Sequence, residues 1–241
     1  MMKMHIRILT ALIAICAVLV AKAQVGEPRH NLCFGFSAGV AMNTVDFDPT
    51  IKQVQHVGPT VGVALKYTSE KYFNTYCSLY GELNYTQLGW KEDIVDAHSQ
   101  PLPDTFQNNI SYVQLPLFAR LSWGREKNGA QFFFQAGPQF GFCLGESSKR
   151  SNVWTLNADG KPSRPNNVYE QYNMKVERKF DYGIAAGLGL EINTNVGHFI
   201  AEGRYCYGLG DMYGNSKKDV FARSANATIF IKLAYLFDLK K

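Results

Sequence analysis

The sequence predicts an all-β protein: an eight-stranded antiparallel up-and-down transmembrane β-barrel, preceded by a cleaved signal peptide. Two observations support this fold class. The chain begins with an export signal, and eight runs between residues 32 and 237 alternate a bulky apolar side chain with a small or polar one. A period of two is typical of strands whose two faces meet different environments. No helical pattern interrupts these runs.

The first 23 residues have the three parts of a signal peptide. A short basic segment precedes residues 8–20, which are apolar apart from Thr10, and Ala21 and Ala23 are the small residues that a signal peptidase reads. The apolar part is too short for a membrane-spanning helix, which needs about 20 residues. We therefore expect residues 1–23 to be a signal peptide and residues 24–241 to form one outer-membrane β-barrel domain.

Charge argues against a nucleic-acid partner. The formal net charge of the 241-residue chain is +5, and removal of the signal peptide takes away Lys3, Arg7 and Lys22 but no acidic residue, which leaves +2. The mature chain also has no basic block of the kind that binds phosphate backbones. Its charges are close to balanced.

Four cysteines remain after removal of the signal peptide: Cys33, Cys77, Cys143 and Cys206. An even number in an exported chain is compatible with disulfides. The wide and irregular spacing, without a Cys-x-x-Cys motif, favours free thiols, and three of the four fall on strand positions that face the predicted interior. Both states stay open on the sequence.

The eight predicted strands cover residues 32–42, 58–67, 76–90, 110–123, 130–145, 180–193, 199–209 and 224–237. In order along the chain, their bulky faces carry Phe36 and Val40, Val61 and Leu65, Leu79 and Leu83, Leu115 and Leu117, Phe132 and Phe140, Ile184 and Leu188, Tyr205 and Leu209, and Ile231 and Leu233. Their opposite faces carry residues such as Gly39, Gly62, Glu82, Gln114, Gly137, Gly187, Arg204 and Ala234. Each run therefore qualifies as a two-faced strand.

Alternation alone does not say which face points inward. A soluble lipocalin-like barrel would turn the bulky face to its interior. The interior of an eight-stranded barrel is just wide enough for its side chains, and roughly five large residues from every strand would overfill it. A water-exposed face would also be rich in Lys and Glu, whereas the small-residue face is rich in glycine. We therefore expect the bulky face to contact lipid and the other face to fill the interior.

The predicted interior face carries equal numbers of cationic and anionic residues. Because an unpaired buried charge is costly, this balance predicts a structural salt-bridge network across the lumen. The alternative is a polar pathway or a proton-coupled site, for which eight strands leave little room. The residues are Lys66, Arg120, Arg204 and Lys232 with Glu82, Asp181, Glu191 and Glu202.

The connections alternate between short and long, as in outer-membrane barrels with periplasmic turns and extracellular loops. The longest predicted loop, residues 146–179, contains Trp154, Tyr169 and Tyr172 among polar and basic residues. Because function tends to lie on loops held by a rigid scaffold, these three aromatics are candidate binding residues. The alternative is a solvated loop without a site. Trp90 is expected in an aromatic girdle at the outer rim.

No catalytic residue and no metal site are predicted. The histidines of the mature chain lack metal-ligand spacing. The Gly-x-Ser-x-Gly sequence at residues 35–39 lies within a strand pattern and has no helix after it, so it is not a nucleophile elbow. Asp96, His98 and Ser99 form a sequence cluster in an outer loop, but adjacent loop residues rarely provide the geometry of a catalytic triad.

A series of short motifs runs through these strands, and on them the chain resembles the PorT-like outer-membrane β-barrel family of Bacteroidetes. The motifs are Glu82-Leu83-Asn84-Tyr85, Tyr112-Val113-Gln114-Leu115-Pro116-Leu117, Gly137-Pro138 with Gly141-Phe142, Asp181-x-Gly183 with Gly187-x-Gly189-x-Glu191, Glu202-x-Arg204-Tyr205-x-Tyr207-Gly208-Leu209, and Tyr235-Leu236-Phe237. The resemblance covers nearly the whole mature chain. It implies an eight-stranded outer-membrane barrel, and the family's namesake is an accessory of a protein-secretion system. One departure is that residues 238–241 follow the closing Phe237.

Together these observations predict a non-enzymatic protein of the cell outer membrane that is a structural or accessory component of the envelope, with a link to protein secretion as one option. The expected partners are outer-membrane lipid and other envelope or secretion-system proteins. We expect no cofactor. An outer-membrane lipid-modifying enzyme and a narrow pore are the alternatives that the sequence leaves open.

Overall fold

The computed structural model describes residues 26–96, 98–164 and 168–240. The predicted signal peptide, residues 1–23, lies outside the described residues. The strands of the described part are β1 (Glu27–Asp48), β2 (Gln53–Val54), β3 (His56–Tyr72), β4 (Thr75–Glu92), β5 (Phe106–Gly124), β6 (Gly129–Arg150), β7 (Phe180–Thr194), β8 (Gly197–Asp211) and β9 (Arg223–Lys240); a 3-10 helix, η1, covers Glu170–Tyr172. In these same residue ranges, no helix is both long and apolar enough to cross a membrane.

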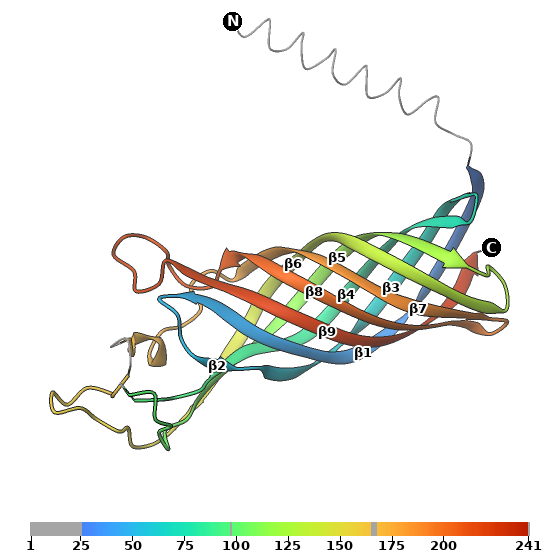
Figure 1. The fold of residues 1–241 in the computed structure, drawn as a ribbon. Coiled ribbons are helices and arrows are strands. Elements are labelled where there is room, and N and C mark those ends of the chain that lie inside the picture. Colours follow the sequence, from blue (N-terminus) through green and yellow to red (C-terminus); the bar gives the residue numbers. More distant parts are fainter. Residues whose placement is uncertain (1–25, 97, 165–167, 241) are drawn as a thin grey trace, which may run out of the picture.

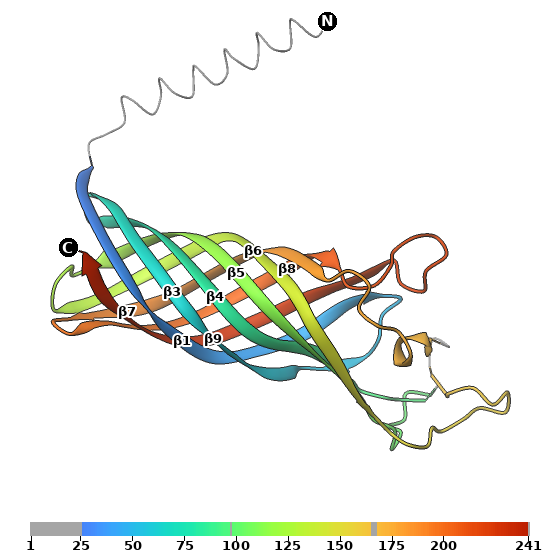
Figure 2. The same cartoon turned by 180° about the vertical axis from the view of Figure 1, so that it is seen from behind.

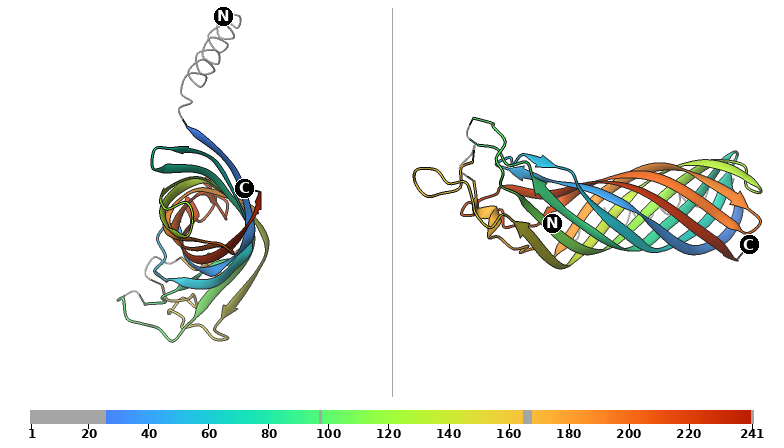
Figure 3. Two further views of the ribbon diagram at one scale, coloured as in Figure 1. Left: turned by 90° about the vertical axis from the view of Figure 1, so that its right-hand side faces the viewer. Right: turned by 90° about the horizontal axis from the view of Figure 1, so that it is seen from below.

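The eight strands other than β2 close into a barrel, and Figures 1 and 2 show their arrangement. Each pairs antiparallel with its neighbours along the chain, and β1 pairs with β9 to close the ring. Figure 3 shows the strands surrounding a common axis in its left-hand view. The two-residue strand β2 pairs only with the end of β4, at Glu92 and Lys91. The eight-stranded up-and-down barrel predicted from the sequence is therefore confirmed.

The short and long connections lie at opposite ends of the barrel. Residues 73–74, 125–128 and 195–196 form the short turns at the end where β9 finishes, and the longer connections lie at the other end (Figure 1). Outer-membrane barrels have short periplasmic turns and longer extracellular loops. We therefore call these ends the periplasmic end and the outer end.

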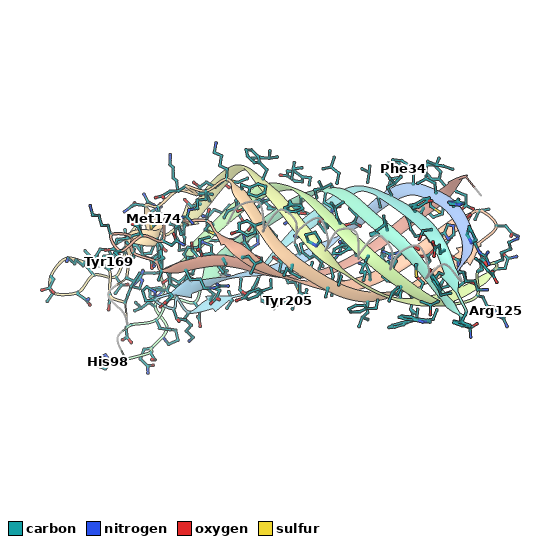
Figure 4. The ribbon with its side chains drawn as sticks, turned by 90° about the horizontal axis from the view of Figure 1, so that it is seen from above. Phe34, His98, Arg125, Tyr169, Met174 and Tyr205 are labelled. Atoms are coloured by element: carbon teal, nitrogen blue, oxygen red, sulfur yellow. The ribbon has the colours of Figure 1, made fainter. Side chains whose placement is uncertain are left out.

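The bulky faces of the strands point away from the barrel axis, as predicted. Phe36, Leu188 and Tyr205 are 59%, 56% and 48% exposed, respectively. Figure 4 shows Phe34 and Tyr205 on the outer surface of the strands. An apolar belt of this kind suits a bilayer, because the closed ring leaves no open strand edge and the exposed side chains match the lipid.

Glycine on the opposite face lets neighbouring strands approach closely. A Cβ atom on Gly35 would lie 1.8 Å from the carbonyl oxygen of Tyr235, and one on Gly39 would lie 2.2 Å from that of Ile231. Both contacts are with backbone, so the neighbour could not move aside without disturbing the pairing of β1 with β9. The glycines on this face of β1 therefore belong to the seam that closes the barrel.

The strands extend further toward the outer end than the sequence predicted. β1 continues to Asp48, where it pairs with Arg223, and β6 continues to Arg150, where it pairs with Phe106. The prediction ended these strands early because polar residues, for example Asn43, break the apolar pattern there. Asn43 nevertheless lies opposite Thr228 in the ladder and is fully buried.

Trp90 is not part of a lipid-facing girdle, so that prediction is wrong. Its side chain is 0% exposed and packs against Phe47 and Phe106, with ring centroids 5.1 Å and 5.0 Å away. The reason is strand parity: Trp90 is an even-numbered residue of β4, like the buried Tyr80 and Glu82. Aromatic character alone does not overrule the alternation of a strand.

A charge on the lipid-facing side should destabilise the barrel. Leu188 lies in the middle of β7, and Leu188→Arg is expected to lower the free energy of unfolding by about 2–4 kcal/mol, because an arginine at the bilayer midplane loses its hydration. The measurement is urea unfolding of the refolded protein in lipid vesicles. The matched control is Val196→Arg in the β7–β8 turn, where the valine is 72% exposed. Equal losses for the two variants would contradict the assignment of the lipid face.

Candidate functional site

The interior of the barrel contains a continuous chain of ion pairs. Lys66 of β3 contacts Glu191 of β7, and Glu191 Oε2 lies 3.5 Å from Arg120 Nη1 of β5. Arg120 Nη2 lies 3.4 Å from Glu202 Oε2 of β8. Four strands that are not all neighbours in the sheet are thus connected across the lumen.

The chain continues from Glu202 to the opposite wall. Arg204 Nη2 donates to Glu202 Oε1 at 2.5 Å and to Glu82 Oε2 of β4 at 2.6 Å. Lys232 of β9 donates through Nζ to the same Glu82 oxygen at 2.7 Å. Positive and negative groups alternate along the whole chain, so that each carboxylate has at least one cationic partner.

Neutral side chains add further contacts to these charges. Gln135 accepts from Arg120 Nε at 2.9 Å and donates to Glu202 Oε2 at 2.9 Å. The Arg120 guanidinium also lies over the rings of Tyr80 and Phe133, at 3.8 Å and 3.9 Å from their centroids, in the geometry of cation–π contacts. The sequence analysis did not single out these neutral partners, because glutamine and aromatic side chains on an interior face carry no distinctive spacing.

Asp181 lies apart from this chain. Its Oδ2 accepts from Asn226 Nδ2 at 3.0 Å, and Asp181 pairs with Gly141 near the start of β7. The structure therefore brings together seven of the eight charged residues that the sequence placed in the interior. It adds His198, whose Nδ1 lies 2.9 Å from Glu191 Oε1. We name the connected set Lys66, Glu82, Arg120, Glu191, Glu202, Arg204 and Lys232 the lumen network.

Aromatic side chains fill the barrel above the lumen network at its outer end. Phe47 lies between Trp90 and Phe221, with ring centroids 5.1 Å and 4.8 Å away. Phe106 links Trp90 to Tyr172 of η1 at 4.9 Å. This aromatic cluster joins the barrel wall to the long outer loop, so that the loop packs on the barrel as a cap.

The three candidate aromatics of the outer loop, residues 151–179, lie close together. Trp154 and Tyr172 stack with centroids 4.4 Å apart and an interplanar angle of 25°. Together with Tyr169 they line a cavity of about 410 Å³, which Arg150 and Asn173 also border. Figure 4 shows Tyr169 and Met174 at the outer end of the molecule. The structure thus places all three predicted residues around one opening.

A buried arginine anchors this loop to the barrel. Arg164 is 3% exposed; its Nη1 lies 3.4 Å from Asp104 Oδ2, and its Nε donates to the Tyr172 hydroxyl at 2.5 Å. The Tyr172 hydroxyl in turn donates to Glu92 Oε1 at 2.9 Å. Burial, followed by the Glu92 carboxylate, raises the pKa of Tyr172, so this hydroxyl keeps its proton. From the sequence, Arg164 is only one of several basic residues in the loop.

The Asp96–His98–Ser99 cluster forms a turn. Asp96 Oδ1 accepts from the backbone N–H groups of His98 and Gln100, both at 2.8 Å, and the His98 side chain is 88% exposed. The aspartate is therefore engaged in local backbone capping. All four cysteines of the described chain are unpaired, and Cys33, Cys143 and Cys206 are buried on the interior side.

Comparison with known proteins gives one family match. Residues 22–214 match the model of the outer membrane protein β-barrel domain. No curated protein matches the sequence.

Several solved structures of small outer-membrane proteins align with this chain at low sequence identity. Ail of Yersinia pestis, in complex with the heparin analogue sucrose octasulfate, is 15% identical; the alignment covers 87% of this chain and all of that one, with a TM-score of 0.38. Neisserial surface protein A is 12% identical over 84% of this chain and 96% of that one, with a TM-score of 0.41. OprG from Pseudomonas aeruginosa is 9% identical over 88% and 96%, with a TM-score of 0.40.

Neutralising one charge of the lumen network should destabilise the barrel. Glu202→Gln keeps the size of the side chain but leaves Arg120 and Arg204 undercompensated, so the free energy of unfolding is expected to fall by about 3–5 kcal/mol. Glu27→Gln, which weakens an exposed pair with Arg29, is the control and should cost at most about 1 kcal/mol. Urea unfolding in vesicles measures both. A loss for Glu202→Gln no larger than that of the control would refute a structural role for the network.

Proposed function

Since the chain belongs to the outer membrane protein β-barrel domain family, we propose that it is a non-enzymatic accessory protein of the cell envelope that presents its outer loop to another envelope protein. The observation that carries this proposal is the contrast between a filled lumen and an ordered outer loop that borders an open cavity. The first argues against transport, and the second offers a surface for recognition.

The filled lumen argues against a pore. Arg120 and Glu191 are 0% exposed, and Lys232 is 1% exposed. A conducting pathway needs hydrated groups along its length, whereas these side chains are occupied by one another. The interior of an eight-stranded barrel has no room beyond its side chains. The barrel therefore acts as a rigid support.

The outer loop has the features of a recognition surface. Its opening exposes parts of Trp154 and Tyr169 beside Arg150, and aromatic and arginine side chains are enriched where proteins bind one another. The Arg164 anchor and the Trp154–Tyr172 stack hold the opening in one arrangement, which lowers the entropy lost on binding. Loops on a rigid scaffold commonly carry function.

The proposal that the partner belongs to a protein-secretion system rests on the PorT-like motifs. These motifs run through β4 to β9, among them Glu82-Leu83-Asn84-Tyr85, and the namesake of that family serves protein secretion. We therefore propose a component of a protein-secretion system as the partner. The turn formed by Asp96, with its exposed His98, offers no oriented nucleophile, which argues against the lipid-modifying enzyme.

Site-specific photo-crosslinking in intact cells tests this proposal. A photo-reactive amino acid at Tyr169 is expected to give a crosslinked product with a defined envelope protein, because this residue borders the opening. The same amino acid at Lys217, an exposed residue of the β8–β9 loop, is the control and should not give that product. Mass spectrometry identifies the product.

A variant in which a short turn replaces residues 151–179 provides a second test of the same proposal. It should still migrate as a compact unheated barrel on a gel, because the barrel strands are unchanged, and it should lose the partner in co-purification. Crosslinks only to lipid, or identical products from Tyr169 and Lys217, would refute a loop-specific protein partner. A partner outside protein secretion would refute only the proposal of a secretion-system partner.

A further inference from the structure

Residues of the first and last strands meet a histidine of β8 inside the periplasmic end of the barrel. Cys33 of β1 and Asp238 of β9 are direct partners in the ladder, and His198 at the start of β8 lies opposite Leu236 of β9. The side-chain atoms Cys33 Sγ, His198 Nε2 and Asp238 Oδ1 lie within 4.8 Å of one another. We name these three residues the seam triad, because β1, β9 and β8 lie at and beside the closure of the barrel.

The spacing of the seam triad matches a set of zinc ligands. Cys33 Sγ lies 3.7 Å from His198 Nε2 and 3.2 Å from Asp238 Oδ1, and the latter two atoms are 2.9 Å apart. Zinc bonds of about 2.3 Å to sulfur and about 2.0–2.2 Å to nitrogen and oxygen place tetrahedral ligands roughly 3.3–3.6 Å apart. The three atoms therefore need to move by only a few tenths of an ångström to enclose an ion.

The other nitrogen of His198 is held as in metal sites. His198 Nδ1 lies 2.6 Å from Asn193 Oδ1 and 2.9 Å from Glu191 Oε1. In the metal-free site both ring nitrogens face acceptors, so Nε2–H donates to Asp238 Oδ1 at 2.9 Å. Loss of that proton, with Nδ1–H held by its own acceptors, would free the Nε2 lone pair for a metal ion. Ligating histidines commonly have this outer partner, which orients the ring and increases its basicity.

A cavity gives this group access to solvent. The opening has a volume of about 490 Å³ and is bordered by His198, Asp238, Asn193 and Arg29. It leaves space for a water molecule as the fourth ligand of a tetrahedral ion. The Cys33 thiolate and the Asp238 carboxylate would together neutralise a divalent cation, and the thiol proton and the imidazole Nε2 proton would leave through this cavity to the periplasm.

We propose that the seam triad binds one divalent transition-metal ion, with zinc as the best match, at the periplasmic end of the barrel. A thiolate, an imidazole and a carboxylate form a ligand set of mixed softness that suits zinc better than calcium or magnesium, which prefer oxygen. In this proposal Asp238, the residue that follows Phe237, is a metal ligand.

Cobalt(II) titration of the full mature chain tests the proposal. The chain is refolded in detergent without a polyhistidine tag and freed of metal, and the probe is CoCl₂ followed by competition with ZnCl₂. The expected result is one equivalent of bound cobalt, with the near-ultraviolet charge-transfer band of a cobalt–thiolate bond and visible bands of tetrahedral cobalt. Zinc should displace the cobalt and remove these bands.

Variants assign the ligands. Cys33→Ala should abolish the thiolate band, and Asp238→Asn should weaken cobalt binding at least tenfold. The matched control is Cys206→Ala, which removes another buried interior cysteine and should leave the band unchanged. A wild-type chain that binds no stoichiometric cobalt, or binds it without a thiolate band, overturns the proposal whatever the variants do. So does a band that persists in Cys33→Ala.

Discussion

Arg120 and Arg204 lie fully inside a closed barrel, and the burial of these two guanidinium groups is the constraint on which the rest of the structure depends. A buried cation is tolerated only when carboxylates and other acceptors surround it. Glu202 lies between the two arginines, Glu191 and Glu82 lie beyond them, and Lys66 and Lys232 end the chain. The strands must therefore adopt the one register that brings all these groups together, since a shift by one residue would turn them to lipid.

The same constraint explains the division of the molecule into a support and a cap. With the lumen filled and the wall facing lipid, polar surfaces lie at the two ends of the barrel. At the outer end, the aromatic cluster around Trp90 continues the packing of the barrel into the long loop, and Arg164 repeats the principle of the lumen network on a smaller scale, as a buried cation between Asp104 and Glu92. At the periplasmic end, the network reaches His198 through Glu191. Side chains of the barrel interior thus contact and position residues at both ends.

Most of the barrel could be predicted from the sequence, because lipid and a narrow lumen impose opposite demands on alternate residues. Leu188 and Arg204 were assigned to the correct faces by parity alone. Parity would also have placed Trp90 inside, and there the expectation of an aromatic girdle misled the prediction. The separation of Asp181 from the network depends on its position along β7, which alternation does not measure. The meeting of Cys33, His198 and Asp238 depends on the β1–β9 and β8–β9 registers, which no local pattern specifies.

If paired charges close the lumen, the barrel carries no current, and conductance is the first property to measure. Refolded protein of residues 24–241 would be inserted into planar lipid bilayers in molar KCl, with a known porin as the control for insertion. We expect no steady conductance from this protein at any applied voltage that the bilayer tolerates, because the lumen network leaves no hydrated path. Stable single-channel currents from the unmodified barrel would contradict it, because they would mean that the network lines a pathway and does not fill one.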